Sequence, residues 1–287
     1  MRSPFFNARR LVRSVPDSAN VKRSTGKMNT PKNQDMGPVY AVLRDKARRI
    51  AGGLPKADFY RVHHAAIARS REILQGHALL AEIFILVRRT IENDFGHGLT
   101  HARKVALDAG ALMLIECARS GIAAAATERN LLLVQAAGLL HDMRRKERHH
   151  ARAGARFARK ALTAFSLTPQ EIDIVCYAIR NHEAFKRIQP PPTPEAALMS
   201  DCLYDADKFR WGPDNFTDTL WDMVTFYNPP LSVFVKRYPA GMRKLEEIKS
   251  TFRSHTGKRY GPQMIDFGVR IGRELMNVIR TEFTHLI

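Results

Sequence analysis

Cysteine is scarce in this chain. The 287 residues include three cysteines, Cys117, Cys176 and Cys202, which lie far apart and lack the short spacings of a zinc site. An odd number of widely separated cysteines does not make a disulfide framework, and such frameworks belong to oxidising compartments. We therefore expect a reduced chain with buried free thiols, a cytoplasmic location and no redox chemistry at cysteine.

Long hydrophobic runs are missing as well. The apolar stretches Ala78–Val87 and Leu131–Leu140 meet charged residues well before the ~20 residues that a helix needs to cross a bilayer. The sequence thus predicts no transmembrane segment and no membrane partner. Hydrophobic residues still make up 45% of the chain, which is enough to fill the core of one large domain.

Acidic residues are few relative to basic ones. The chain has 28 Asp and Glu against 46 Lys and Arg, so its formal net charge is +18. A positive field attracts anions, so a nucleotide or a nucleic acid is an expected partner. The basic residues are spread widely instead of forming one stripe, and a basic soluble protein without such a partner explains the charge equally well.

Residues 1–37 differ in composition from the rest of the chain. They carry eight basic side chains against two acidic ones and show no sustained apolar period, which predicts a disordered basic tail. An arginine-rich, acid-poor start is also similar to an organellar presequence. Met28 and Met36 offer the other explanation, a start codon further downstream.

The remaining sequence has a helical period almost throughout. Apolar residues recur three and four positions apart, as in Ala78, Leu79, Ile83, Leu86 and Val87. This period predicts an all-α fold, a compact helical bundle. The breaks divide it into an N-terminal helical extension (38–89), a central domain (90–212) and additional C-terminal helices (213–287) that pack on the same core.

Two helix boundaries can be predicted more closely. Ser166 to Pro169 is typical of a helix start, with the proline in the first turn, and we expect a helix over Glu171–Arg180. Between Tyr238 and Phe283 we expect two helices, separated at residues 256–258, which read Thr-Gly-Lys.

Four short polar motifs occur in the central domain. They are His97-Gly-Leu-Thr-His101, His141-Asp142, Arg180-Asn-His182-Glu183 and Asp205-Ala-Asp207. Each is weak evidence alone, but their order and their places beside apolar runs form a joint pattern. Over about residues 90–210 the chain resembles the HD domain superfamily of metal-dependent phosphohydrolases, which implies a bundle of the HD-domain type.

The resemblance implies a metal site made by His101, His141, Asp142 and Asp207. His101 is favoured over His97, and Asp207 over Asp205, because they match the family pattern more closely. Mixed imidazole and carboxylate ligands suit Mn, Fe, Ni, Zn or Mg. One ion is expected, and His97 is either a group that contacts substrate or an ordinary loop residue.

The resemblance also leaves room for a second ion. Its ligands would be His150 and His182, although Asn181 stands where a second histidine often occurs in relatives with two metals. The same two histidines could instead hold a substrate phosphate or be structural. The sequence does not decide among these three roles.

The implied reaction is hydrolysis of a nucleotide or another small phosphomonoester or phosphodiester. A bound divalent ion lowers the pKa of its water and polarises the phosphoryl group. We expect catalytic roles for Asp142, His182 and Arg145, with Glu183 as an alternative base. The predicted contacts to the substrate phosphate are His97, Lys104, Arg144 and Lys208.

Two other functions stay open on the sequence. Some relatives hold two irons on this scaffold and activate oxygen, so a di-iron oxygenase is one alternative. The other is a basic binding protein that has lost catalysis and binds a nucleotide or nucleic acid. Phe209 and Trp211 could stack on a base, but core packing is the more ordinary role of such residues.

Overall fold

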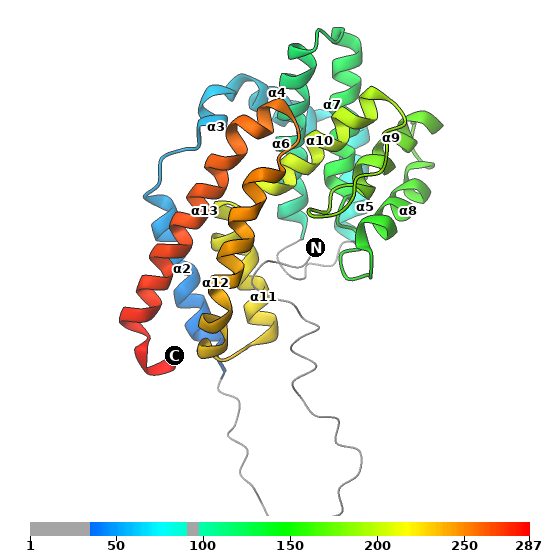
Figure 1. The fold of residues 1–287 in the computed structure, drawn as a ribbon. Helices are drawn as coiled ribbons and strands as arrows, with labels where there is room; N and C mark the ends of the chain where they lie inside the picture. The colour runs from blue at the N-terminus through cyan, green and yellow to red at the C-terminus, as the bar shows by residue number, and fades with distance from the viewer. Residues whose placement is uncertain (1–34, 91–97) are drawn as a thin grey trace, which may run out of the picture.

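The computed structural model describes residues 35–90 and 98–287, and every regular element within them is a helix. The predicted all-α fold is therefore confirmed for this part of the chain (Figure 1). The predicted tail falls almost entirely on residues 1–34, which lie outside the described residues, as does His97. No helix among the described residues is long and apolar enough to cross a membrane.

Four helices precede the central domain. They are α2 (Gly37–Gly52), α3 (Asp58–Val62), α4 (His64–Gly76) and α5 (Ala78–Thr90). Five helices follow: α6 (Leu99–Arg119), α7 (Ala124–Leu140), α8 (His150–Leu162), α9 (Pro169–Arg180) and α10 (Pro194–Phe209). The C-terminal part consists of η1 (Asn215–Thr219), α11 (Leu220–Tyr227), α12 (Leu231–Ile248), η2 (Lys249–Thr251), α13 (His255–Glu282) and η3 (Thr284–Leu286).

The core of the central domain is built around α7. Its residues from Leu133 to Leu140 are all buried, so this helix is covered on every side and not only along one stripe. Helices α5, α6, α9 and α10 pack against it. One hydrophobic cluster extends from α2 to α13 and includes Tyr40, Leu112 and Ile271, so the flanking helices share the core of the central domain.

Helices α6 and α7 approach each other very closely at one glycine. A Cβ atom placed on Gly138 would lie 2.6 Å from the Cα of Ala106 and 2.8 Å from its backbone nitrogen. Only glycine therefore fits at position 138 without moving one helix. This contact sets the spacing of the two helices near the start of α6 and the end of α7.

Helix α9 begins two residues before the predicted Glu171 and ends at Arg180 as predicted. Pro169 is its first residue, and the Thr168 side chain accepts a hydrogen bond from the backbone nitrogen of Glu171. The Glu171 carboxylate accepts one in return from the backbone nitrogen of Thr168, which completes a capping box.

The predicted break at residues 256–258 was wrong. Helix α12 ends at Ile248 and α13 begins at His255, so Gly257 lies in the first turn of α13. A Cβ atom on Gly257 would lie 1.9 Å from Oδ2 of Asp205, so this glycine serves close packing and not a helix break. The same Asp205 carboxylate accepts hydrogen bonds from the backbone nitrogens of Arg253 and Ser254, both at 2.8 Å.

Candidate metal centre

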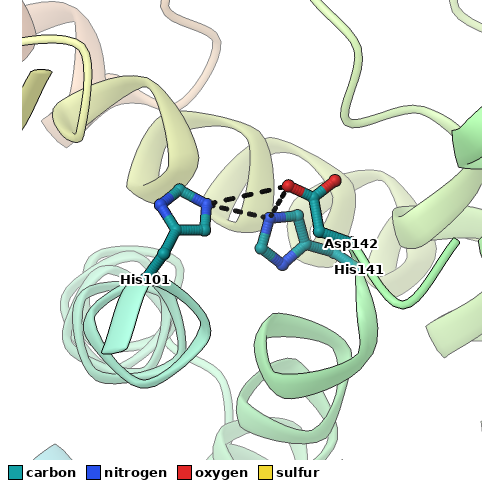
Figure 2. Close-up of side chains that lie close together, drawn as sticks. All are labelled: His101, His141 and Asp142. Atoms are coloured by element: carbon teal, nitrogen blue, oxygen red, sulfur yellow. Dashed lines mark hydrogen bonds and ion pairs between the residues drawn. The ribbon is translucent and has the colours of Figure 1, made fainter. Parts of the chain in front are cut away.

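Three buried side chains from two helices converge on one point in the central domain. His101 lies in the first turn of α6, and His141 and Asp142 follow the last residue of α7 (Figure 2). Nε2 of His101 is 3.3 Å from Nε2 of His141 and 3.9 Å from Oδ2 of Asp142. Nε2 of His141 is 3.5 Å from the same carboxylate oxygen. These three residues form the first donor group.

A fourth donor reaches this group from α10. Asp207 lies in the last turn of that helix, and its Oδ1 is 3.3 Å from Nε2 of His101 and 3.8 Å from Nε2 of His141. The structure thus brings together all four residues that the sequence pattern indicated for one ion. His141 and Asp142 can both face the site because the α-helix ends at Leu140, whereas neighbours within a helix diverge by about 100°.

Asp142 also belongs to a second donor group. Its Oδ1 is 3.4 Å from Nε2 of His182 and 3.7 Å from Nε2 of His150, and those two ring nitrogens are 3.3 Å apart. His150 is the first residue of α8, and His182 lies just after α9. The Asp142 carboxylate therefore lies between the two groups, with one oxygen toward each.

Three of the histidine rings donate a hydrogen bond from Nδ1, which leaves the lone pair of Nε2 directed toward the donor groups. Nδ1 of His141 donates to the Gly138 carbonyl oxygen at 2.8 Å, and Nδ1 of His182 donates to that of Ile179 at 2.6 Å. Nδ1 of His150 donates to Oε1 of Glu183 at 3.0 Å. A neutral ring that donates from Nδ1 presents a lone pair at Nε2, which is the arrangement of metal-binding histidines.

The donor spacing fits a bound divalent ion. Metal–ligand bonds of about 2.0–2.2 Å place neighbouring ligands about 2.8–3.1 Å apart in octahedral geometry and about 3.3–3.6 Å apart in tetrahedral geometry. The closest separations within the two groups are 3.3 Å. Lone pairs and carboxylate oxygens repel one another at such distances, and a cation between them removes that repulsion.

The pKa shifts of the histidines and of Asp207 favour the protonation states that bind metal. Burial lowers the pKa of His150 to about 4, and burial likewise lowers the pKa of His101 and His182. For Asp207, burial acts to raise the pKa, but the Lys208 ammonium and neighbouring histidines outweigh it, and the pKa is well below the usual range. Neutral imidazoles and ionised carboxylates are the forms that bind metal.

The family model of the HD domain matches residues 98–211. This chain carries an HD domain. The matched segment begins just before α6 and ends just after α10, so it contains both donor groups and all five helices of the central domain. The resemblance found in the sequence is thereby confirmed.

Two further comparisons add little to the HD domain match. A comparison with curated proteins finds no match for the chain. Among solved structures, the chain is similar to a predicted HD superfamily hydrolase from an uncultured Thermotogales bacterium. That similarity has a TM-score of 0.45 and 20% sequence identity, and it covers 72% of this chain and 97% of the other.

Two cations lie against the donor groups of the HD domain. Nη1 of Arg145 is 3.1 Å from Nε2 of His150 and 3.4 Å from Oδ1 of Asp142. The fully buried Lys208 ammonium donates to Oδ2 of Asp207 and lies 4.9 Å from the centre of the Tyr204 ring. Lys208 therefore holds one oxygen of Asp207 while the other faces the histidines.

The remaining predicted phosphate contacts lie further from the donor groups. Arg144 stacks on Phe157 at 4.6 Å and pairs with Glu147 at 3.7 Å, so the structure does not bring it to the metal centre. Lys104 donates to Oδ1 of Asp214 at 2.8 Å, beside the first donor group. The roles of these residues in phosphate binding stay predictions.

Asp205, Phe209 and Trp211 were alternative site residues in the sequence, and the structure gives each of them a place in or against the core. Asp205 is fully buried. Its carboxylate accepts hydrogen bonds from the backbone nitrogens of Arg253 and Ser254, just before α13, and it belongs to neither donor group. Phe209 is 1% exposed and packs on Phe59 and Phe252, as a core residue does. Trp211 is partly buried against the same core.

A buried network beside the metal centre was not predicted from the sequence. Arg210 donates to the carboxylates of Asp108 and Asp214 and to the hydroxyl of Tyr60, and Tyr60 itself donates to Asp108 at 2.7 Å. Arg210 and Asp214 line a cavity of about 320 Å³ that also reaches His101 and Lys104. No short motif marks Tyr60, which lies in α3, so only the folded chain brings this network to the site.

Proposed function

We propose that the HD domain of this chain hydrolyses a phosphate ester with the help of one divalent metal ion in the first donor group. The observation that carries the proposal is the convergence of His101, His141, Asp142 and Asp207 at metal-ligand spacing. A divalent ion held there would supply a water of lowered pKa and a positive charge beside the phosphoryl group. Mn, Fe, Ni, Zn and Mg all suit these ligands.

Basic side chains near the donor groups would neutralise the negative charge of the substrate phosphate. Phosphoryl transfer needs positive charge at the non-bridging oxygens, and a planar guanidinium can hold two of them at once. Arg145 is the best placed, because Nη1 is within 3.4 Å of Asp142 and its side chain is 18% exposed. The charge of Lys104 is partly offset by Asp214, so we give it a lesser part.

We propose that Asp142 and His182 take part in proton transfer during the reaction. Nε2 of His182 lies 3.4 Å from Oδ1 of Asp142, and its Nδ1 hydrogen is already committed to the Ile179 carbonyl. Nε2 is therefore the ring atom that can accept a proton. The Glu183 carboxylate accepts a hydrogen bond from Nδ1 of His150. We therefore assign Glu183 the role of orienting that ring and not the role of a base.

The position of Arg145 favours one bound ion over two. A guanidinium can only donate hydrogen bonds, so Nε2 of His150 uses its lone pair to accept from Arg145 at 3.1 Å. The positive charge of Arg145 thus lies where a second ion would need to bind. The position of Arg145 also weighs against a di-iron oxygenase, which requires both groups to be loaded with iron.

The predicted ion count can be tested by changing Arg145. The unaltered protein should bind one equivalent of Mn²⁺ tightly, and R145M should bind a second because His150 and Asp142 then lose their competing cation. The readout is equilibrium dialysis with metal analysis. R148M is the matched control, since Arg148 is exposed and lies in the same loop. Two equivalents of equal affinity in the unaltered protein would show that Arg145 does not occupy the second group.

The substrate is proposed only as a chemical class. A small phosphate ester fits the cavity of about 320 Å³ beside His101, and the net charge of +18 favours an anion. We keep nucleotides as the first substrates to test, and nucleic acid as a second. We also propose a cytoplasmic location, which the buried free thiols at Cys117, Cys176 and Cys202 support.

Metal removal tests the hydrolase proposal. Protein treated with a chelator and reloaded with each candidate ion should hydrolyse at least one member of a panel of mononucleotides, cyclic nucleotides and aryl phosphates. Chelation should reduce the rate at least about 1000-fold, because a metal supplies several kcal/mol to such reactions. Metal binding without turnover on any phosphate ester would favour the alternative of a non-catalytic binding protein.

A further inference from the structure

A second cavity lies between α8 and α9, which run side by side in Figure 1. Its volume is about 520 Å³, larger than that of the cavity beside His101. Side chains of both helices and of the proline-rich connector before α10 line it. We call it the α8–α9 groove. The lining residues used below are Arg152, Arg156, Arg159, Asp173, Tyr177, Arg180, Pro190 and Pro192.

Four arginines dominate this groove. Arg152, Arg156 and Arg159 are spaced four and three residues apart on α8, so they share one face of that helix, and Arg180 faces them from the end of α9. One acidic side chain, Asp173, is among the lining residues, and it pairs with Arg159 at 2.6 Å. Within the described residues, the other three guanidinium groups have no ion pair, so the groove has a surplus of positive charge.

Three less polar residues, Tyr177, Pro190 and Pro192, also line the groove, and hydrogen bonds hold this part of it in place. The Tyr177 hydroxyl donates to the Gln189 carbonyl oxygen at 2.6 Å, and the Gln189 backbone nitrogen donates to Oδ1 of Asn181 at 3.0 Å. These bonds fix the connector against α9. Pro190 and Pro192 follow the held Gln189 and line the groove together with Tyr177.

We propose that the α8–α9 groove binds an anion that carries two or more linked phosphate groups. Three unpaired guanidinium groups in one concave site exceed the charge that a single carboxylate can balance, whereas a phosphate chain offers several charges along its length. Arginine suits such a ligand because its planar fork binds phosphate oxygens in pairs. A volume of about 520 Å³ also lies in the range of small-molecule sites.

The groove is separate from the metal centre. None of its lining residues belongs to either donor group. Arg152 is two residues from His150 and Arg180 is two residues from His182, yet all four groove arginines are exposed while both histidines are buried. The ligand would therefore bind whether or not the metal centre is loaded, and the proposal does not depend on the hydrolase function.

Calorimetric titration of the full chain tests the proposal. Inorganic triphosphate and ATP are titrated in the presence of a chelator, so that the metal centre does not contribute. We expect saturable binding with one site per chain. R156A and R180A should each weaken it about tenfold, since a hydrogen bond between two charged groups contributes more than a neutral one. Equal affinity for the two probes would identify the phosphate chain as the ligand, and tighter binding of ATP would add a contact to its base.

The matched control is R71A. Arg71 is exposed on α4, and among the described residues it has no ion pair, so its loss changes the net charge equally without touching the groove. It should change the affinity less than twofold. An equal loss in R71A would overturn the proposal, because it would show that the overall positive charge attracts the ligand. Absence of saturable binding, or binding only of nucleic acids too long for the groove, would overturn it too.

Discussion

Replacing Asp142 with asparagine should abolish metal binding at the first donor group and reduce hydrolysis at least about 1000-fold. Asp142 directs one carboxylate oxygen to His101 and His141 and the other to His150 and His182. Asparagine keeps the size of the side chain but removes its negative charge. No other residue of the two groups reaches both, so this substitution should have the largest effect on function.

The measurement is metal content after dialysis, together with the hydrolysis rate and the far-ultraviolet circular dichroism spectrum. The spectrum should not change, because Asp142 follows α7 and is not part of any regular helix. D45N is the matched control, since Asp45 is exposed on α2, far from both groups in sequence. A D142N protein that keeps one full equivalent of metal would contradict the central role given to this carboxylate.

Replacing Gly138 with alanine should have the largest effect on the framework of the site. The added Cβ would meet the backbone of Ala106 at 2.6 Å, and backbone atoms cannot rotate away as a side chain can. Helix α7 would have to shift from α6, at a cost of about 3 kcal/mol in the free energy of unfolding. His101 lies on α6 and His141 directly follows α7, so metal affinity should fall as well.

Urea denaturation and metal titration of G138A measure the two effects. G52A is the control, because Gly52 ends α2 and a Cβ atom there would meet nothing within 4 Å. That variant should be as stable as the unaltered protein or slightly more so. If G138A lost no stability, the close approach of the two helices would not be the constraint described above.

Much of the fold could be predicted from local sequence. Helical period depends on residues three and four positions apart, and the start of α9 depends on Thr168 and Pro169, which act within one turn. Gly257 was wrongly predicted to separate two helices, because glycine is common both at helix breaks and where two elements pack closely. Here it makes room for Asp205 in a tightly packed helix, and only the neighbouring helix reveals that.

The four proposed ligands of the first group could be identified because their order follows a family pattern. Their surroundings could not be predicted. Lys208 was expected to bind phosphate, and the structure pairs it with Asp207 in the core. The direction of a long side chain depends on tertiary contacts that the sequence does not display. The same limit applies to Arg145, whose pairing with His150 bears on the number of ions.

The most direct test of the account is anomalous X-ray diffraction from crystals of the full chain soaked in Mn²⁺. The account predicts one strong anomalous peak within bonding distance of His101, His141, Asp142 and Asp207, with the Arg145 guanidinium still against His150. A peak elsewhere on the protein, with none among these four side chains, would contradict the claim that they form a metal centre.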